Sequence, residues 1–141
     1  MIKIINQNDK QGKLSFITDM STTLANAIRR SALEIPVMAI DEVEIIKNDS
    51  ALYDEMIAHR IGLIPIKTDK GIKEQKFKLK AVGPCTVYAT DIKPSIETDL
   101  KIPIVILHDE QELEIVAEAR PGKGIEHIKY SPGLIYFRHN I

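Results

Sequence analysis

The side chains that could do chemistry in this sequence are histidines, arginines and carboxylates, and their spacing favours protein contacts over catalysis. His59 and Arg60 are adjacent, and His59 follows Glu55 by four residues, which is the spacing of an ion pair on a helix. Glu126 and His127 form a second pair behind a glycine-rich corner. Neither pair is accompanied by the serine or cysteine nucleophile that a catalytic histidine would activate. A small enzyme built on Glu126 and His127 is therefore only a weaker alternative.

Metal and nucleotide binding are also weakly indicated. The histidines are far apart and show no HExxH or His-x-His spacing, and the single cysteine, Cys85, cannot build a zinc site alone. The corner at residues 121–124, PGKG, lacks the length and the Lys-Ser/Thr ending of a Walker loop. The carboxylates of residues 109–114 are expected on a solvated strand edge. We therefore predict no metal and no cofactor.

Composition indicates a protein of the cell interior that does not bind DNA through charge alone. The 141 residues carry 19 basic and 20 acidic side chains, so the formal net charge is -1. Binding to duplex DNA needs a clustered basic face, which leaves a stand-alone nucleic-acid binder as a third, disfavoured interpretation. A single cysteine suits a reducing compartment, and the amino terminus has no signal pattern. No run reaches the roughly 20 apolar residues that span a bilayer, so we expect a cytoplasmic protein with no membrane contact.

Turn residues and hydrophobic periodicity predict an α+β fold. Residues 1–6 and 13–18 are expected to form a hairpin around a turn at 8–12. A helix follows, capped by Ser21 or Thr22 and ended by Pro36. Residues 37–47 form a strand, and a second helix begins at a Ser50 cap and ends at Gly62 in the left-handed conformation. Further strands are expected at residues 63–66, 77–81, 86–90, 102–107 and 113–119.

The first helix presents an apolar stripe flanked by two arginines. Leu24, Ile28 and Ile35 recur at helical spacing. Arg29 and Arg30 point about 100° apart, so at least one of them projects from the flank of the stripe. They are either solvated charges or anchors of a protein interface, where a planar guanidinium pairs with carboxylates. A contact to phosphate has no supporting basic cluster.

Three long motifs in the same order resemble one family. The stretches TLANAIRRSALEIPVMAIDEVEI, NDSALYDEMIAHRIGLIPI and DEQELEIVAEARPGKGIEHIKYSP resemble the D subunit of archaeal RNA polymerase. That family is related to the amino-terminal domain of the bacterial alpha subunit and to the third-largest subunit of eukaryotic RNA polymerase II. The resemblance covers nearly all of the chain.

The resemblance implies a partial alpha-type dimerisation domain, made of the hairpin plus the helix, with an inserted β-rich domain. Residues 1–36 would belong to the first domain and residues 37–131 to the insertion, and residues 132–141 would start the return to the dimerisation domain. The implied function is that of a non-catalytic assembly subunit of a DNA-dependent RNA polymerase. In the family this subunit pairs with a smaller alpha-like subunit, the L subunit. The pair is the platform for the second-largest subunit, the other large subunit and further small subunits.

The resemblance also implies which residues contact partners. Asn26, Arg29 and Arg30 match the family's Asn-Ala-x-Arg-Arg motif, implicated in dimer geometry and in holding the second-largest subunit. A second motif, Asp-Glu-x-x-x-His-Arg-x-Gly-x-x-Pro, and a third at the glycine-rich corner look like further contact surfaces. The predicted partner-binding residues are Leu24, Asn26, Ile28, Arg29, Arg30, Ile35, Glu55, His59, Arg60, Gly62, Pro65, Gly122, Gly124, Glu126, His127 and Lys129.

Two departures from the family pattern lead to further expectations. Some relatives carry cysteines for zinc or an iron–sulfur cluster, but residues 67–75 hold none, in keeping with the prediction of no metal. The family chain normally continues past the equivalent of Ile141 with a strand and a long helix. We therefore expect a companion C-terminal fragment or a natural truncation, and an apolar stripe on the first helix that lacks part of its cover.

Overall fold

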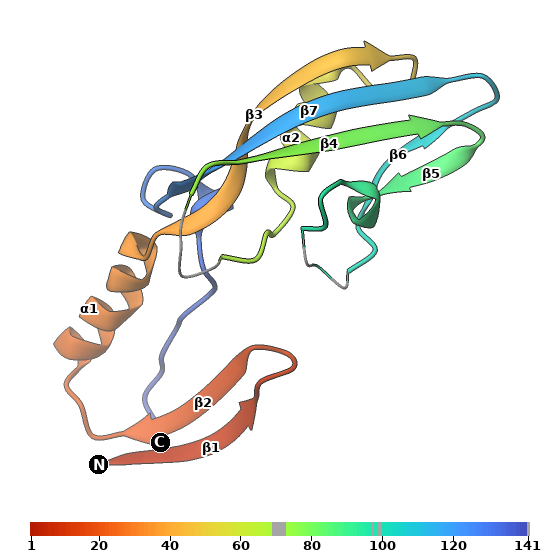
Figure 1. The fold of residues 1–141 in the computed structure, drawn as a ribbon. Helices are drawn as coiled ribbons and strands as arrows, with labels where there is room; N and C mark the ends of the chain where they lie inside the picture. The colour runs from red at the N-terminus through yellow and green to blue at the C-terminus, as the bar shows by residue number, and fades with distance from the viewer. Residues whose placement is uncertain (69–72, 97, 99, 141) are drawn as a thin grey trace.

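The computed structural model describes residues 1–68, 73–96, 98 and 100–140, and it confirms the α+β class. Within these residues, two α-helices and three small sheets follow one another along the chain (Figure 1). The strands are β1 (Ile2–Asn8), β2 (Lys13–Thr18), β3 (Val37–Asn48), β4 (Gln75–Val82), β5 (Cys85–Tyr88), β6 (Pro103–Leu107) and β7 (Glu112–Gly122). The α-helices are α1 (Thr22–Ser31) and α2 (Asp54–Gly62), and 3-10 helices cover Ala32–Glu34, Ala89–Asp91 and Ile128–Tyr130.

The first two strands form a separate antiparallel hairpin, as predicted. Its turn closes with a hydrogen bond from the Gly12 N–H to the Asp9 carbonyl (3.3 Å), and Gly12 has a φ of 61°, which glycine adopts without steric cost. The hairpin lies apart from the other two sheets, and α1 leads from it toward them (Figure 1). No residue of β1, β2 or α1, all of which the structure describes, is buried. This part of the chain therefore has no core of its own.

The main sheet has the strand order β3-β7-β4 with antiparallel neighbours, so the long strand β7 lies at its centre. The register aligns Ile115 of β7 with Ile45 on one side and with Leu79 on the other. Because side chains alternate along a strand, such rows form one apolar face. The opposite face carries charges, among them the ion pair between Lys76 and Glu118 (3.0 Å).

The core lies between this sheet, α2 and the hairpin of β5 and β6 (Figure 1). Ile57 and Ile61, about one turn apart on α2, belong to one buried cluster with Phe77 of β4 and Leu107 of β6. Burying one such side chain contributes roughly 2 kcal/mol. The β-rich part of the chain is thus stabilised by its own apolar cluster.

The segment 63–66 is not the strand that the sequence predicts. It has no regular structure, although Ile64 and Ile66 are buried in the core. Pro65 lacks the N–H that a strand ladder needs, and the two isoleucines are buried through side-chain packing instead. An apolar run is therefore a poor guide to strand structure here.

Two helix ends also differ from the prediction. Gly62 is the last residue of α2 and does not have a positive φ; Leu63 continues the right-handed turn, and its N–H donates to the His59 carbonyl (3.3 Å). The predicted left-handed end at Gly62 is therefore wrong. α1 ends at Ser31, short of Pro36; a 3-10 helix covers Ala32–Glu34, and Ile35 is extended. In the described part of the chain, no helix is long and apolar enough to cross a membrane.

Candidate protein-binding surfaces

The predicted apolar stripe of α1 is uncovered. α1 is capped by Ser21, whose Oγ accepts a hydrogen bond from the Leu24 N–H (3.2 Å). Leu24 and Ile28 are 50% and 44% exposed. Ile35 is 53% exposed but does not lie on the helix as predicted, because it follows α1 and the 3-10 helix and has an extended backbone. Removing a half-exposed isoleucine from water contributes about 1 kcal/mol, so covering the stripe with another apolar surface would be favourable.

The hairpin carries further exposed apolar side chains. Monomeric proteins rarely leave many large apolar side chains in one region of the surface, and such regions mark interaction sites. The resemblance places the hairpin in the dimerisation domain but does not single out its side chains. The following exposed apolar residues lie on both faces of the hairpin, on α1 and just after it, and we call them together the α1–hairpin surface: Ile2, Ile4, Ile5, Leu14, Phe16, Ile17, Leu24, Ile28 and Ile35.

The two arginines of α1 have different surroundings. The Asn26 Oδ1 accepts hydrogen bonds from both the Nε (3.1 Å) and the Nη2 (2.8 Å) of Arg29. Arg30 is exposed and has no hydrogen-bond or ion-pair partner among the residues that the structure describes. The motif therefore holds one guanidinium group in place and leaves the other in solvent.

The second motif lies on α2. Asp54 and Glu55 are in its first turn and His59 and Arg60 in its last turn, so these charges are placed favourably in the field of the helix dipole. The Arg60 Nη2 donates to the Pro103 carbonyl (2.9 Å), which ties α2 to β6. Among the described residues no ion pair joins Glu55 to His59, and both are exposed. Arg60 thus has a contact within the chain, whereas its neighbour His59 faces solvent.

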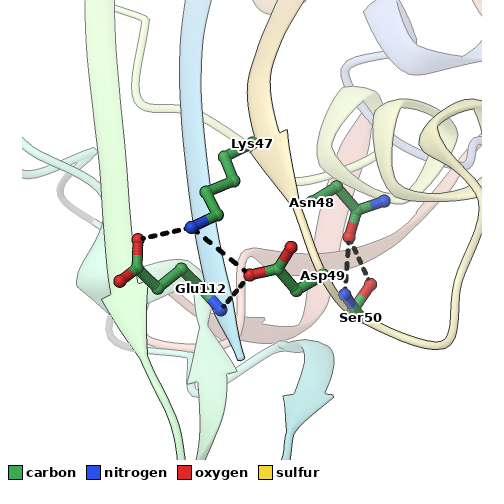
Figure 2. Close-up of polar contacts among 5 residues, drawn as sticks. All are labelled: Lys47, Asn48, Asp49, Ser50 and Glu112. Carbon is green, nitrogen blue, oxygen red and sulfur yellow. Dashed lines mark hydrogen bonds and ion pairs between the residues drawn. The ribbon is translucent and has the colours of Figure 1, made fainter. Parts of the chain in front are cut away.

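A polar network fixes the end of β3 just before α2 (Figure 2). The Lys47 ammonium lies 3.2 Å from a carboxylate oxygen of Glu112 and 3.7 Å from one of Asp49. The Asp49 N–H donates to the Glu112 carbonyl, and the Glu112 N–H donates to the Asp49 Oδ2, each at 3.0 Å. The hydrogen bond to Glu112 raises the pKa of Lys47, and the charge of Asp49 adds to this. The network joins the end of β3 to the start of β7.

Asn48 connects this network to α2. Its Oδ1 accepts hydrogen bonds from the N–H (3.0 Å) and the hydroxyl (2.5 Å) of Ser50. Its Nδ2 donates to the Leu52 carbonyl (2.9 Å) and to the Asp54 Oδ1 (2.8 Å). The predicted Ser50 cap is wrong, because the residue at the cap position is Tyr53, without a side-chain hydrogen bond. Asn48, in the preceding strand, orders the turn instead.

The third motif forms a corner, residues 121–131, that is held on Asp41 of β3. The Lys129 Nζ (2.5 Å) and the Tyr130 hydroxyl (3.1 Å) donate to the Asp41 Oδ1, and Arg120 makes an ion pair with the other carboxylate oxygen. The Lys129 hydrogen bond holds the pKa of the Asp41 carboxyl below its ordinary value, against the effect of burial, and Tyr130 and Arg120 lower it further. Sequence reasoning singled out Lys129 and missed its three partners in this cluster.

Two predicted glycines allow close packing at this corner. A Cβ added to Gly122 would lie 2.5 Å from the Tyr130 ring, and one added to Gly124 would lie 3.0 Å from the Leu33 side chain. The Ile125 N–H donates to the Leu33 carbonyl (3.2 Å). The corner therefore touches the segment that follows α1 as well as β3.

The second and third motifs meet at a shallow hollow. Its lining includes His59, Gly62 and Leu63 beside His127 and Lys129 of the corner. The His127 Nδ1 accepts a hydrogen bond from the Lys129 N–H (3.1 Å), so a neutral ring carries its proton on Nε2. We call this site the α2–corner hollow. Segments that are far apart in the sequence thus form one surface, and the residues of α1 are not part of it.

The remaining predicted residues are not part of the hollow, and the described residues give no support for metal binding. Pro65 and Glu126 are exposed and lie outside the lining of the hollow. The described residues contain no group of three or more His, Cys, Asp or Glu side chains arranged to hold a metal ion. Cys85 is exposed, and its Sγ lies 3.5 Å from the Val82 carbonyl oxygen. Part of the segment 67–75, in which no metal ligand was predicted, lies outside the described residues.

Comparison with known proteins identifies the family. Residues 16–129 match the model of the RNA polymerase Rpb3/Rpb11 dimerisation domain. Similar proteins named DNA-directed RNA polymerase subunit Rpo3 include one from Pyrococcus horikoshii, 40% identical over 99% of this chain and 60% of the relative. One from Methanocaldococcus jannaschii is 44% identical over 78% of the chain and 60% of the relative, and one from Halobacterium salinarum is 31% identical over 98% and 59%.

The chain spans about 60% or less of the length of these relatives. The match nevertheless extends from β2 through Lys129 and includes the first two motifs on which the resemblance rested and all but the last three residues of the third. The chain belongs to the RNA polymerase Rpb3/Rpb11 dimerisation domain family.

Proposed function

We propose that this chain is a non-catalytic assembly subunit of a DNA-dependent RNA polymerase, in the role of the archaeal D subunit, acting in transcription in the cytoplasm. It pairs with a smaller alpha-like subunit, the L subunit, through the α1–hairpin surface. Residues 1–36, with 132–141, serve this pairing, and residues 37–131 form the inserted β-rich domain. The names of the relatives and the description of the matched family support this assignment.

The observation that carries the proposal is the contrast between two parts of one chain. The β-rich part buries many large apolar side chains in a single cluster, although some, such as Ile106, are exposed, whereas β1, β2 and α1 bury none. A free monomer gains nothing from the exposed isoleucines and leucines of the α1–hairpin surface, while a partner that covers them gains their transfer from water. We infer that pairing with another polypeptide is the use of this surface.

A second set of contacts completes the platform. We propose that Arg30, Glu55 and the α2–corner hollow contact the second-largest subunit and other small subunits. Arg30 and Glu55, and His59 and His127 of the hollow, are polar and exposed, as suits the rim and the anchors of an assembly interface. Sequence-specific contacts to DNA form no part of the proposal.

Co-expression with an archaeal L subunit tests the pairing. The wild-type pair should elute as a one-to-one complex in size-exclusion chromatography with light scattering. Ile28→Asp should weaken pairing by about 30-fold or more, because it removes apolar area and puts a carboxylate into the interface. Ile106→Asp is the matched control: Ile106 is 61% exposed, but it lies on β6 in the β-rich part. Equal pairing by Ile28→Asp and the wild type, with both folded by circular dichroism, would refute the proposal.

A further inference from the structure

The paired arginines of α1 are held unequally, and Asn26 is the cause. Its single amide oxygen accepts from the Nε at 3.1 Å and from the Nη2 at 2.8 Å of Arg29, three residues further along the helix. Residues three apart are neighbours on a helix surface, so the contact forms within α1. Asn26 is half-buried and Arg29 is exposed.

This contact occupies one defined edge of the guanidinium group. Nε and Nη2 form its side edge, one of the two edges that can grip a carboxylate with a pair of hydrogen bonds. With that edge taken by Asn26, Arg29 presents its outer edge, formed by the two Nη atoms, to a partner. Arg30 has no such restraint in the described part of the chain, and all five of its N–H groups remain available.

The intrinsic helix propensity of asparagine does not explain its presence at position 26. Asparagine has a lower helix propensity than alanine, because its side chain competes for backbone hydrogen bonds. Its amide points instead to the guanidinium of Arg29. A long side chain that is already ordered loses less entropy when it binds, which strengthens the contact without adding a new one.

We propose that Asn26 is a positioning residue that orders Arg29 before assembly, so that Arg29 meets a carboxylate of the second-largest subunit end-on. Arg30 is ordered only when the partner arrives. This inference rests on the proposed function, since it assigns distinct roles to two residues of the same interface.

A double-mutant cycle tests the proposal. The affinity of the preformed pair of this chain with the L subunit for the second-largest subunit is measured for the wild type, Asn26→Ala, Arg29→Ala and the double variant. Asn26→Ala should weaken binding about fivefold, the effect of having to order one long side chain on binding. In the Arg29→Ala background the same change should have no effect. Thr23→Ala, which removes another exposed polar side chain from α1, is the control and should bind like the wild type.

A readout on the free chain separates positioning from a general effect on the helix. In NMR spectra of 15N-labelled chain, the Nε–H of Arg29 should exchange with water more slowly than that of Arg30, and Asn26→Ala should remove the difference. Equal exchange in the wild type, or a fivefold loss that persists in the Arg29→Ala background, overturns the positioning role and leaves the proposed function standing. A wild-type pair that does not bind the second-largest subunit overturns both.

Discussion

Replacing Asp41 with asparagine should destabilise the chain by about 2 kcal/mol at neutral pH, because hydrogen bonds to a charged, partly buried group contribute roughly 1.5–3 kcal/mol each. Asp41 accepts from Lys129 and Tyr130 and pairs with Arg120. The Asp41 and Lys129 side chains are only 17% and 13% exposed, so water screens this pair weakly. Asparagine keeps the shape and one acceptor oxygen but not the charge, which leaves the Lys129 cation without its counterion.

The destabilisation by Asp41→Asn should also depend on pH. The pKa of Asp41 is lowered in the folded chain, first by the Lys129 hydrogen bond. A carboxyl group of this kind stabilises the folded state above its unfolded pKa and loses that effect as the pH falls through the folded value. The difference in unfolding free energy between wild type and Asp41→Asn should therefore be constant between about pH 5 and 7 and shrink below about pH 4.

Urea unfolding followed by circular dichroism at several pH values measures this difference. Glu44→Gln is the matched control, because it removes one carboxylate charge from an exposed position of the same strand and should shift stability by less than about 0.5 kcal/mol. A loss for Asp41→Asn no larger than that of the control would refute the role assigned to Asp41. A loss that stays constant down to pH 3 would show that charge is not the cause.

Two further substitutions test the glycine corner and the turn between β3 and α2. Gly122→Ala should lower the free energy of unfolding by about 1–3 kcal/mol in the same urea assay, because its Cβ would lie 2.5 Å from the buried Tyr130 ring. Gly133→Ala, where nothing lies within 4 Å of the added Cβ, should be neutral. Equal effects of the two substitutions would contradict the packing argument. Asn48→Ala should lower the free energy of unfolding by about 1–2 kcal/mol, because it removes the hydrogen bonds from the Asn48 amide to the Leu52 carbonyl and to Asp54. It should also speed amide hydrogen exchange in α2 more than in β7, and unchanged exchange in α2 would contradict this.

The sequence predicted elements whose pattern is local. The hairpin is marked by its Asn, Asp and Gly residues, and β4 alternates lysine with Phe77 and Leu79, so each could be located from neighbouring residues alone. Ile64 and Ile66 misled the prediction, because a buried apolar run looks the same whether its backbone is paired in a sheet or not.

The candidate binding residues were also predicted only where their pattern is local in the sequence. Helix spacing was enough to find the stripe and the arginines of α1, and the resemblance supplied the other motifs. Asp41 could not be found, because it meets Lys129 across 88 positions of sequence and has no local sign of its role. The Ser50 cap failed because α2 begins only at Asp54, and the Ser50 Oγ accepts instead from the Leu52 N–H in the turn before the helix.

The contacts of the corner explain why the motifs can act together. Ile125 bonds to Leu33 just after α1, and Lys129 bonds to Asp41 on β3, so one short segment touches both parts of the chain. Each link is short and directional, which restricts how α1 can move relative to α2 and the hollow beside it. A polypeptide bound to the α1–hairpin surface would thus lie at a set position relative to one bound at the α2–corner hollow. The proposed function, in which the chain positions two different partners relative to each other, is favoured by this geometry, which an apolar patch alone would not provide.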